Sequence, residues 1–429
     1  MLLRRLFGKD GVDNLFKLCD ALMAESGEYA STALAREALD AYEALDQPGR
    51  AQFFDVLARD YSPSPEAVTG SAAAYQADPS PGNLERLFAV VEPRRQELFR
   101  RLNMAPGGTA ALVEMRSELL KSLRGRPQWA VIDADLLHLL RSWFNRGFLR
   151  LERIDWRTPA IILEKLIEYE AVHAIQGWRD LQRRLEADRR CFAFFHPQLP
   201  EEPIIFIEVA LTRSMSAHIQ PLLDIGSPVR TANCDCAMFY SITNCQEGLR
   251  GISFGNQLIK QVAEELRREF PHLRRFATLS PLAGFRRWLE QKRVEQPKEL
   301  APLAKLDQPD WHLGEVPDSL QRMLLRLCAF YLVNVKQEGG GNAEPLDAVA
   351  RFHLGNGAAL ERLNWMGDIS ETGMARSAGL MVNYVYRLSE VERNHERYFR
   401  EHAIAVSAAV EKMARECLLA APAEKGAAA

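Results

Sequence analysis

The chain has 429 residues, with 54 Lys and Arg against 57 Asp and Glu, a net charge of −3 and a hydrophobic fraction of 47%. These values exclude a wholly disordered chain, and the near-neutral charge argues against a dedicated nucleic-acid binder. No stretch approaches the roughly 20 apolar residues that a membrane helix needs, and Met1–Gly8 lacks the apolar core of a signal peptide. We therefore expect a cytoplasmic protein of two or three domains with no membrane partner.

The first part of the chain, residues 1–185, is predicted to be a helical domain. Its apolar residues recur at helical spacing, and its breaks carry Pro and Gly. Thr158 is expected to cap a helix with Pro159 at the first helical position. This part is rich in Ala, Leu, Arg and Glu and has no cluster of catalytic residue types, so we expect a role in oligomerisation or as a lid. The predicted helices are residues 32–45, 51–61, 83–102, 109–123, 130–146 and 160–190.

The second part, residues 186–429, is predicted to be a mixed α/β domain, so the fold class is α+β. Strands are expected where β-branched and aromatic residues cluster between prolines, and Asn356-Gly357 suggests a hairpin. A helix is expected from Leu258 to Phe270, a long helix over residues 391–419 and a loose tail after it. The predicted strands are residues 191–196, 203–212, 237–243, 275–280, 348–354, 358–364 and 380–386.

A glycine-containing loop joins the strand at 237–243 to the helix that follows. Glycines let the backbone approach a ligand closely, and free amides at a helix start favour an anion such as pyrophosphate. The spacing of Gly248, Gly251 and Gly255 matches neither a Walker loop nor the dinucleotide fingerprint. A phosphate-binding loop and a purely structural turn both remain open from this pattern alone.

A basic stretch follows the loop. Between Arg267 and Lys298 there are nine Lys and Arg residues against three Asp and Glu. Such a local excess suits a multiply phosphorylated small molecule, and it is equally typical of a solvated helix face.

The seven cysteines are few and odd in number, which is typical of reduced thiols. Cys234, Cys236 and Cys245 lie close in sequence, but they lack the two-residue ligand spacing of zinc knuckles and a nearby His. We therefore predict buried thiols and no metal site.

Several ordered strings in the second half resemble the malonyl-CoA decarboxylase family. The resemblance is dense over the C-terminal half and weaker over the helical half. The strings that carry it are Gln246–Gly255, Phe270–Leu273, Thr278–Phe285, Phe352–Ala358 and Leu363–Asp368.

The resemblance implies a catalytic domain of the GNAT (N-acetyltransferase) type that binds CoA at a loop opening its central helix. It implies Ser280 and His353 as catalytic residues, malonyl-CoA as substrate, acetyl-CoA as product and no metal or prosthetic group. It also implies a homo-oligomer, either a dimer or a tetramer. The chain ends in Gly-Ala-Ala-Ala rather than a peroxisomal Ser-Lys-Leu, which favours a bacterial cytoplasmic form. The loop residues that it assigns to CoA binding are Arg250, Gly251, Ile252, Ser253, Phe254, Gly255 and Asn256.

The chemistry of decarboxylation explains why Ser and His are suitable. Loss of CO2 sends electrons to the thioester carbonyl, a hydrogen-bond donor stabilises the resulting enolate, and an acid then protonates the α-carbon. Histidine, with an ordinary pKa near 6.5, can give and regain that proton. His353 is expected on a strand, on the same face as Arg351 and away from the core.

Other readings remain open. Glu208 interrupts an apolar strand and suits a cleft or an ion pair, His196 ends a strand before Pro197, and Cys245 adjoins the loop. The alternatives to a decarboxylase are a CoA-dependent N-acyltransferase and a non-enzymatic CoA-sensing or scaffold protein.

Overall fold

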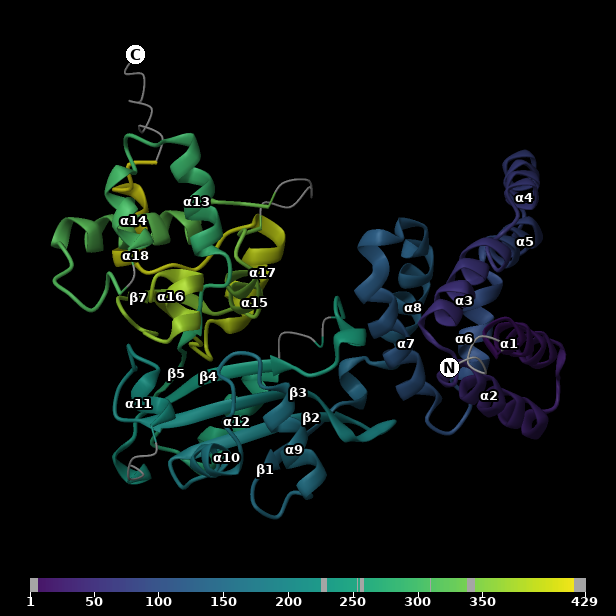
Figure 1. Cartoon of the computed structure of the whole chain (residues 1–429), viewed down its shortest axis with the longest axis horizontal. Helices are drawn as coiled ribbons and strands as arrows, with labels where there is room; N and C mark the ends of the chain where they lie inside the picture. Colours follow the sequence, from purple (N-terminus) through teal and green to yellow (C-terminus); the bar gives the residue numbers. More distant parts are fainter. Residues whose placement is uncertain are drawn as a thin grey trace. The chain divides into compact units, whose positions relative to one another are not determined.

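The computed structural model describes residues 7–224, 230–252, 254, 258–308, 310–337 and 344–419. The chain forms two compact units, and the main break between them falls at residue 150, earlier than the expected domain boundary at residue 185 (Figure 1). The first unit consists of Met1–Arg150, Phe195–Ile204 and Asn244–Phe254. The second consists of Leu151–Phe194, Ile205–Thr243 and Gly255–Ala429.

The first unit is built mainly from helices. Three of them begin with an Asp or Ser whose side chain accepts a hydrogen bond from the first turn, with Pro at the first or second helical position: Asp46, Ser64 and Ser80. Its helices are α1 (Phe7–Ala24), α2 (Glu28–Glu43), α3 (Gln47–Asp60), α4 (Pro65–Ala77), α5 (Pro81–Val91), α6 (Arg94–Leu102), α7 (Gly108–Ser122) and α8 (Ala130–Trp143). Short 3-10 turns occupy Leu123–Gly125, Pro127–Trp129 and Arg146–Phe148.

An aromatic cluster forms the centre of this unit. Phe53 lies between Phe16 and Tyr42, and Phe54 contacts Trp129, with ring centroids 5.1–5.4 Å apart. These side chains come from α1, α2, α3 and the turn before α8. Packing of large rings from four segments explains why helices with modest individual propensity hold together.

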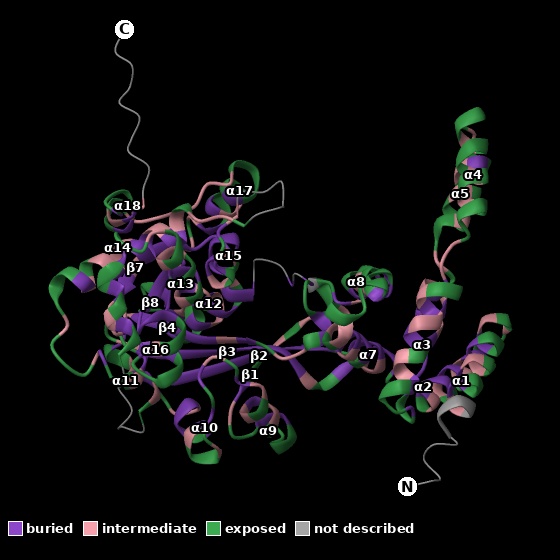
Figure 2. Cartoon of the chain, turned by 45° about the horizontal axis from the view of Figure 1, so that its top comes forward, coloured by how far each residue is buried: buried purple, intermediate pink, exposed green. Residues whose placement is uncertain are grey.

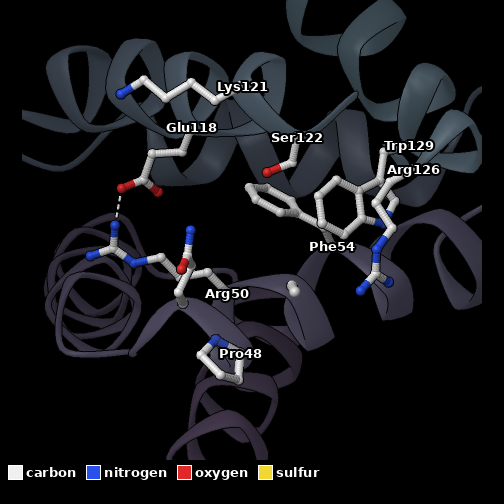
Figure 3. A pocket seen from close by; sticks show the side chains of 10 residues that line it. Pro48, Arg50, Phe54, Glu118, Lys121, Ser122, Arg126 and Trp129 are labelled. Carbon is white, nitrogen blue, oxygen red and sulfur yellow. Dashed lines mark hydrogen bonds and ion pairs between the residues drawn. The ribbon is translucent and has the colours of Figure 1, made fainter. Parts of the chain in front are cut away.

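Helices α4 and α5 form a hairpin that lies outside this cluster. They contact each other, and Asn83 is the one buried residue among the described residues of the two helices. Phe88 is 68% exposed and Val91 is 46% exposed. Figure 2 accordingly shows both helices mostly as exposed or half-buried.

The second unit contains most of an eight-stranded sheet, in the order β1-β2-β3-β4-β5-β8-β6, with β7 also paired to β8. The strands are β1 (Arg150–Ile154), β2 (Arg189–His196), β3 (Leu199–Thr212), β4 (Cys236–Asn244), β5 (Arg275–Thr278), β6 (Ser280–Pro281), β7 (Ala359–Asn364) and β8 (Met381–Val385).

Helices cover this sheet on both sides. In Figures 1 and 2, α9 and α10 lie on the opposite side of β2 and β3 from α14, α15 and α17. A helical N-terminal part followed by a mixed α/β part confirms the predicted fold class. The helices are α9 (Ala160–Tyr169), α10 (Trp178–Arg184), α11 (Gln220–Leu223), α12 (Leu258–Glu269), α13 (Phe285–Glu295), α14 (Asp318–Asn334), α15 (Ala348–Gly355), α16 (Glu371–Ser377), α17 (Val391–Glu401) and α18 (Ala408–Arg415).

Strands β4 and β5 and helix α12 form the predicted strand–loop–helix unit. β4 and β5 are parallel, with Cys236 opposite Arg275 and Phe239 opposite Thr278. Because parallel neighbours need a crossover, α12 connects them and buries one apolar stripe. That stripe consists of Leu258, Ile259, Val262, Ala263 and Leu266.

Three predicted helices are wrong in length. The helix expected over 83–102 is split at Pro93, since Pro lacks an N–H and keeps the residue before it extended. The helix expected over 160–190 is split into α9 and α10, with Gly177 at φ +91° before α10. The helix expected over 391–419 is split where His402 adopts a left-handed conformation. The expected tail, 420–429, lies outside the described residues.

The start of α9 also differs from the prediction. Pro159, rather than Thr158, occupies the N-cap, and it has no side-chain cap. The Thr158 hydroxyl instead accepts from the Asp155 amide and stabilises the preceding turn.

Strand alternation gives the two sides of the sheet around β5 different characters. Met238, Ala277, Leu279 and Met381 belong to one apolar cluster with residues of α11. Thr278 and Ser280 alternate with these residues and therefore face the other side of the sheet. The candidate site lies on that side.

Candidate functional site

Ser280 and His353 meet inside the second unit. The Ser280 Oγ lies 3.0 Å from the His353 Nε2, and the two residues are 5% and 4% exposed. They are 73 positions apart in sequence. The fold therefore brings together the two residues that the family resemblance assigned to catalysis.

The strands position Ser280. It is the first residue of β6 and pairs with Val382 on β8. Its hydroxyl donates to the Thr278 Oγ1 at 2.8 Å, and that oxygen also accepts from the Tyr384 amide at 3.2 Å. Thr278 thus holds the serine hydroxyl against a backbone group of the neighbouring strand.

A helix, not a strand, carries His353. The prediction of a strand over 348–354 is wrong, because residues 348–355 form α15. Asp347 caps this helix by accepting from the Val349 and Ala350 amides at 3.0 and 2.9 Å. The expected alternation of Arg351 and His353 on one exposed face is therefore wrong as well, and His353 is buried.

The predicted hairpin at Asn356-Gly357 is instead the end of α15. Gly357 has φ +79°, and its amide donates to the Leu354 carbonyl at 2.9 Å. A Cβ at Gly357 would lie 2.1 Å from the Val391 carbonyl oxygen, so only glycine fits. Asn-Gly serves hairpins and helix ends alike because both need a left-handed residue.

The hydrogen bonds determine where the imidazole proton lies. The Ser280 hydroxyl gives its proton to Thr278, so its oxygen accepts from the His353 Nε2–H. The Nδ1 of His353 then accepts from the Tyr386 hydroxyl at 2.8 Å. The chain Tyr386–His353–Ser280–Thr278 places a proton on the nitrogen that adjoins the serine.

Burial keeps this imidazole neutral. It lowers the pKa of His353 from 6.5 to about 3. The Tyr384 ring stacks on it at a centroid distance of 4.7 Å. Burial also raises the pKa values of Tyr384 and Tyr386 well above 10, so both hydroxyls stay protonated.

The glycine-containing loop is described at Arg250, Gly251, Ile252 and Phe254. Arg250 is exposed and pairs with Glu247 at 2.6 Å, Gly251 has φ +83°, and Ile252 and Phe254 are buried. The remaining residues that the resemblance assigned to CoA binding lie outside the described residues: Ser253, Gly255 and Asn256.

Helix α7 of the helical part binds the backbone of this loop. The Arg116 Nη1 on α7 donates to the carbonyls of Gly248 and Arg250 at 2.6 and 2.9 Å, and its Nε pairs with Asp133 at 2.7 Å. A Cβ at Gly248 would lie 1.9 Å from the Val113 carbonyl oxygen. Gly248 is therefore needed for close packing against α7 rather than for contact with a ligand.

The other sequence candidates have structural partners. Glu208 is 1% exposed and pairs with Arg184 at 2.7 Å, while burial raises its pKa to about 8. The His196 Nε2 lies 3.1 Å from the Trp143 carbonyl, and its Nδ1 accepts from the Gln198 amide. Cys245 is half-buried and takes part in no disulfide.

No group of three His, Cys, Asp or Glu side chains suited to a metal occurs in the part of the chain that the structure describes. Cys234 and Cys236 are buried, and their thiols contact the Arg230 carbonyl and the Met238 sulfur. Nor does any helix within the described ranges have the length and apolarity to cross a membrane.

The sequence analysis missed four residues that support these groups. Tyr384 on β8 and Tyr386, one residue beyond the end of β8, lie on the same side through their i, i+2 spacing, which could have suggested a common environment. Thr278 stands two residues before Ser280 and offered the same signal. The sequence held no such signal for Arg116, because an Arg on a helix usually lies at the solvent-exposed surface.

Comparison with known proteins shows which family the chain is similar to. The family model "Malonyl-CoA decarboxylase C-terminal domain" matches residues 147–425, and the model of the corresponding N-terminal domain matches residues 61–144. The mitochondrial malonyl-CoA decarboxylase of Rattus norvegicus is 38% identical over 75% of this chain and 71% of its own length. That of Anser anser anser is 36% identical over 83% and 78%.

Solved structures agree with these matches. The crystal structure of malonyl-CoA decarboxylase from Rhodopseudomonas palustris has a TM-score of 0.89 and 49% identity, covering 94% of this chain and 99% of that one. The enzyme from Agrobacterium vitis has a TM-score of 0.87 and 46% identity, covering 93% and 99%. The chain therefore belongs to the malonyl-CoA decarboxylase family.

Proposed function

We propose that the protein converts malonyl-CoA to acetyl-CoA and CO2 and that Ser280 and His353 carry out the reaction. The observation that supports the two residues is the buried chain of hydrogen bonds from Tyr386 through His353 to Ser280. This chain of hydrogen bonds places the His353 Nε2–H and the Ser280 hydroxyl oxygen next to each other, and both residues are buried.

The reaction requires a site for electrons and a source of one proton. The bond between the malonyl carboxylate and the α-carbon breaks, CO2 leaves, and the electron pair moves into the thioester enolate. A donor to the enolate oxygen lowers the energy of this state. One proton added to the α-carbon then gives acetyl-CoA, so malonyl-CoA and H⁺ become acetyl-CoA and CO2.

His353 is proposed to supply that proton. It is neutral in the free protein because its pKa is about 3. A substrate carboxylate beside Nε2 favours the imidazolium and raises the pKa, since nearby negative charge stabilises the charged form. Because Nε2 already carries a proton, the proton taken up on binding goes to Nδ1. The Nε2 proton is then delivered to the α-carbon, which returns the imidazole to its neutral form.

Ser280 is proposed to hydrogen-bond the malonyl carboxylate or the thioester oxygen. When substrate displaces the Thr278 contact, its hydroxyl proton becomes free to point at a developing oxyanion. The reaction as written needs no metal or prosthetic group.

The loop from Arg250 to Asn256 is proposed to bind the CoA part of the substrate. The sequence pattern, a glycine-containing turn before α12, supports this. Arg116 holds the carbonyls of Gly248 and Arg250, which fixes the loop in front of α12. The GNAT-type assignment of the catalytic domain and its expected extent, 186–429, remain part of this proposal.

The assembly is proposed to be a homo-oligomer. The α4–α5 hairpin cannot bury its own apolar residues, and Phe88 and Val91 lie on its surface. Light scattering that gives a dimer or tetramer mass supports the proposal, and a monomer mass at micromolar concentration contradicts it. The vertebrate relatives are named as mitochondrial, and the cytoplasmic location of this chain remains a prediction.

Incubation with malonyl-CoA tests the activity. Release of CO2 and acetyl-CoA without any amine acceptor is the expected result. Acyl transfer that depends on an added amine would indicate an N-acyltransferase instead. Binding of malonyl-CoA without turnover would indicate a CoA sensor or scaffold.

A further inference from the structure

A hollow of about 730 Å³ surrounds the start of β5 and the end of β8 in the second unit. Four arginines line it: Arg267, Arg274, Arg275 and Arg387. Arg267 comes from the last turn of α12 and Arg274 from the connection into β5, while Arg275 begins β5 and Arg387 follows Tyr386, so the fold gathers them from separate segments. A cavity of this volume lies in the usual range for small-molecule sites.

The arginines exceed the carboxylates that face them. Arg387 pairs with Glu361 at 2.7 Å and lies 3.9 Å from Glu390, and Arg275 lies 3.5 Å from Asp235. Within the described ranges, no carboxylate lies within ion-pair distance of Arg267 or Arg274. Their charges repel each other and attract an anion into the hollow.

Local structure does not explain this gathering. The carboxyl end of a helix favours a cation, which accounts for arginines in the last turn of α12. It does not account for Arg274 and Arg387, which lie on connections. Elsewhere in the basic stretch 267–298 most charges are paired within the fold: Arg268 with Glu265, Arg286 with Glu290, Lys292 with Glu295, and Arg293 with Glu290 and Asp307.

The wall of the hollow between the arginines is apolar. Leu273 and Phe276 are 5% and 4% exposed and line it together with Val385. Guanidinium groups on an apolar wall suit a phosphate group attached to a less polar body, because Arg presents paired N–H donors to phosphate oxygens.

The hollow is separate from the Ser280–His353 pair. Ser280 stands four residues after Phe276, which corresponds to about 13 Å of extended chain. Tyr386 lines the hollow and gives its hydroxyl to His353. The Tyr386 ring therefore lies between the hollow and the Ser280–His353 pair.

We propose that this arginine-lined hollow is a binding site for a phosphorylated small molecule, distinct from the place where the CoA thioester reacts. Arg267 and Arg274 provide the unpaired donors, and Arg275 and Arg387 add to the positive field. The ligand contacts the apolar wall with its remaining part.

Isothermal titration with inorganic pyrophosphate tests the site. The full-length protein is first saturated with acetyl-CoA, so that a phosphate-binding loop for CoA is occupied. We expect one saturable site for pyrophosphate per chain, weakened by added NaCl because salt screens the arginines. Arg267→Ala and Arg274→Ala should each weaken binding about tenfold, the usual effect of losing a charge-assisted hydrogen bond.

Arg268→Ala is the matched control, since Arg268 is exposed on the same turn but pairs with Glu265 and does not line the hollow. It should change the affinity less than about twofold, within the usual effect of a surface substitution. Absence of saturable binding, an equal loss in Arg268→Ala, or displacement of pyrophosphate by acetyl-CoA would overturn the proposal. The titration measures binding and needs no turnover, and it can also be run without acetyl-CoA. Its result can therefore be interpreted even if the protein proves to have no decarboxylase activity.

Discussion

The Tyr386 hydroxyl lies 2.8 Å from the Nδ1 of His353, on the opposite side of the imidazole from Ser280. It joins the residue after β8 to helix α15 and fixes which ring nitrogen carries the proton. The histidine is thereby oriented by a neutral phenol, where many other enzymes use a carboxylate for this purpose. This arrangement leads to the first of five predictions.

Tyr386→Phe should lower kcat about 10- to 100-fold with little change in acetyl-CoA affinity, because the imidazole loses the donor that keeps its proton on Nε2. Tyr384→Phe is the matched control: it keeps the ring that stacks on the imidazole, and it should retain near wild-type kcat. Steady-state kinetics on both variants, with acetyl-CoA titrations, measure the effect. Equal losses in the two variants would mean that packing, and not the Nδ1 hydrogen bond, is what matters.

The Ser280–His353 contact should behave as one unit. His353→Ala should reduce turnover by roughly 10²–10⁴ through loss of the acid, and Ser280→Ala by about 10²–10³ through loss of an oxyanion donor. The double variant should lose much less than the product of the two losses. A folded His353→Ala protein that binds acetyl-CoA and turns over at a near wild-type rate would remove His353 from the mechanism, and multiplicative losses would separate the two roles.

Substrate binding should be coupled to proton uptake. His353 is neutral in the free protein, and a malonyl carboxylate beside it should stabilise the imidazolium. Calorimetry at pH 7 with a non-reactive malonyl-CoA analogue, in buffers of different ionisation enthalpy, should show uptake approaching one proton per site. His353→Gln should abolish it, whereas acetyl-CoA, which has no carboxylate, should cause none. Uptake that persists in His353→Gln would assign the proton to another group.

Stability should fall as the pH decreases below about 6.5. The pKa of His353 is lowered from 6.5 to about 3 and that of buried His173 to about 4, mainly by burial. The unfolded chain therefore binds more protons in this window, so the free energy of unfolding rises with pH and is lost on acidification. His353→Gln should reduce this slope by about 1.4 kcal/mol per pH unit, the value of one proton. Urea unfolding between pH 4.5 and 6.5 measures the slope, and exposed His218→Gln is the control. An unchanged slope in His353→Gln would mean that the imidazole is not held neutral.

Arg116→Met should loosen the glycine-containing loop. It leaves the carbonyls of Gly248 and Arg250 without their buried donor and Asp133 without its partner, which should cost about 2–4 kcal/mol of stability. CoA affinity should fall as well if the loop binds the thioester. Arg124→Met, an exposed residue just after α7, serves as the control. Thermal unfolding and CoA titration separate the two effects, and unchanged CoA affinity in a destabilised variant would place the CoA site elsewhere.

Local pattern determined much of this protein. Periodicity and punctuation located β2, β3, β4 and β8 and helices such as α7 and α12, because a chain that buries one face must repeat its apolar residues at 2.0 or 3.6 positions. The family strings contain both Ser280 and His353. The sequence pattern gave the wrong element where two local structures need the same residues. Asn356-Gly357 suits a hairpin and a helix end equally. The segment with His353 was predicted to be a strand, and it is a helix capped by Asp347.

Only the tertiary structure decided how these parts meet. Strand β8 places Tyr386 against an imidazole 33 residues earlier, and β6 places Ser280 against the same ring across 73 residues. Burial there moves the pKa of His353 to about 3, far from the 6.5 that its residue type suggests. Arg116 supports a loop more than 130 positions away for the same reason. Contacts over such separations, and the desolvation that they cause, arise from packing, and a linear pattern carries no record of them.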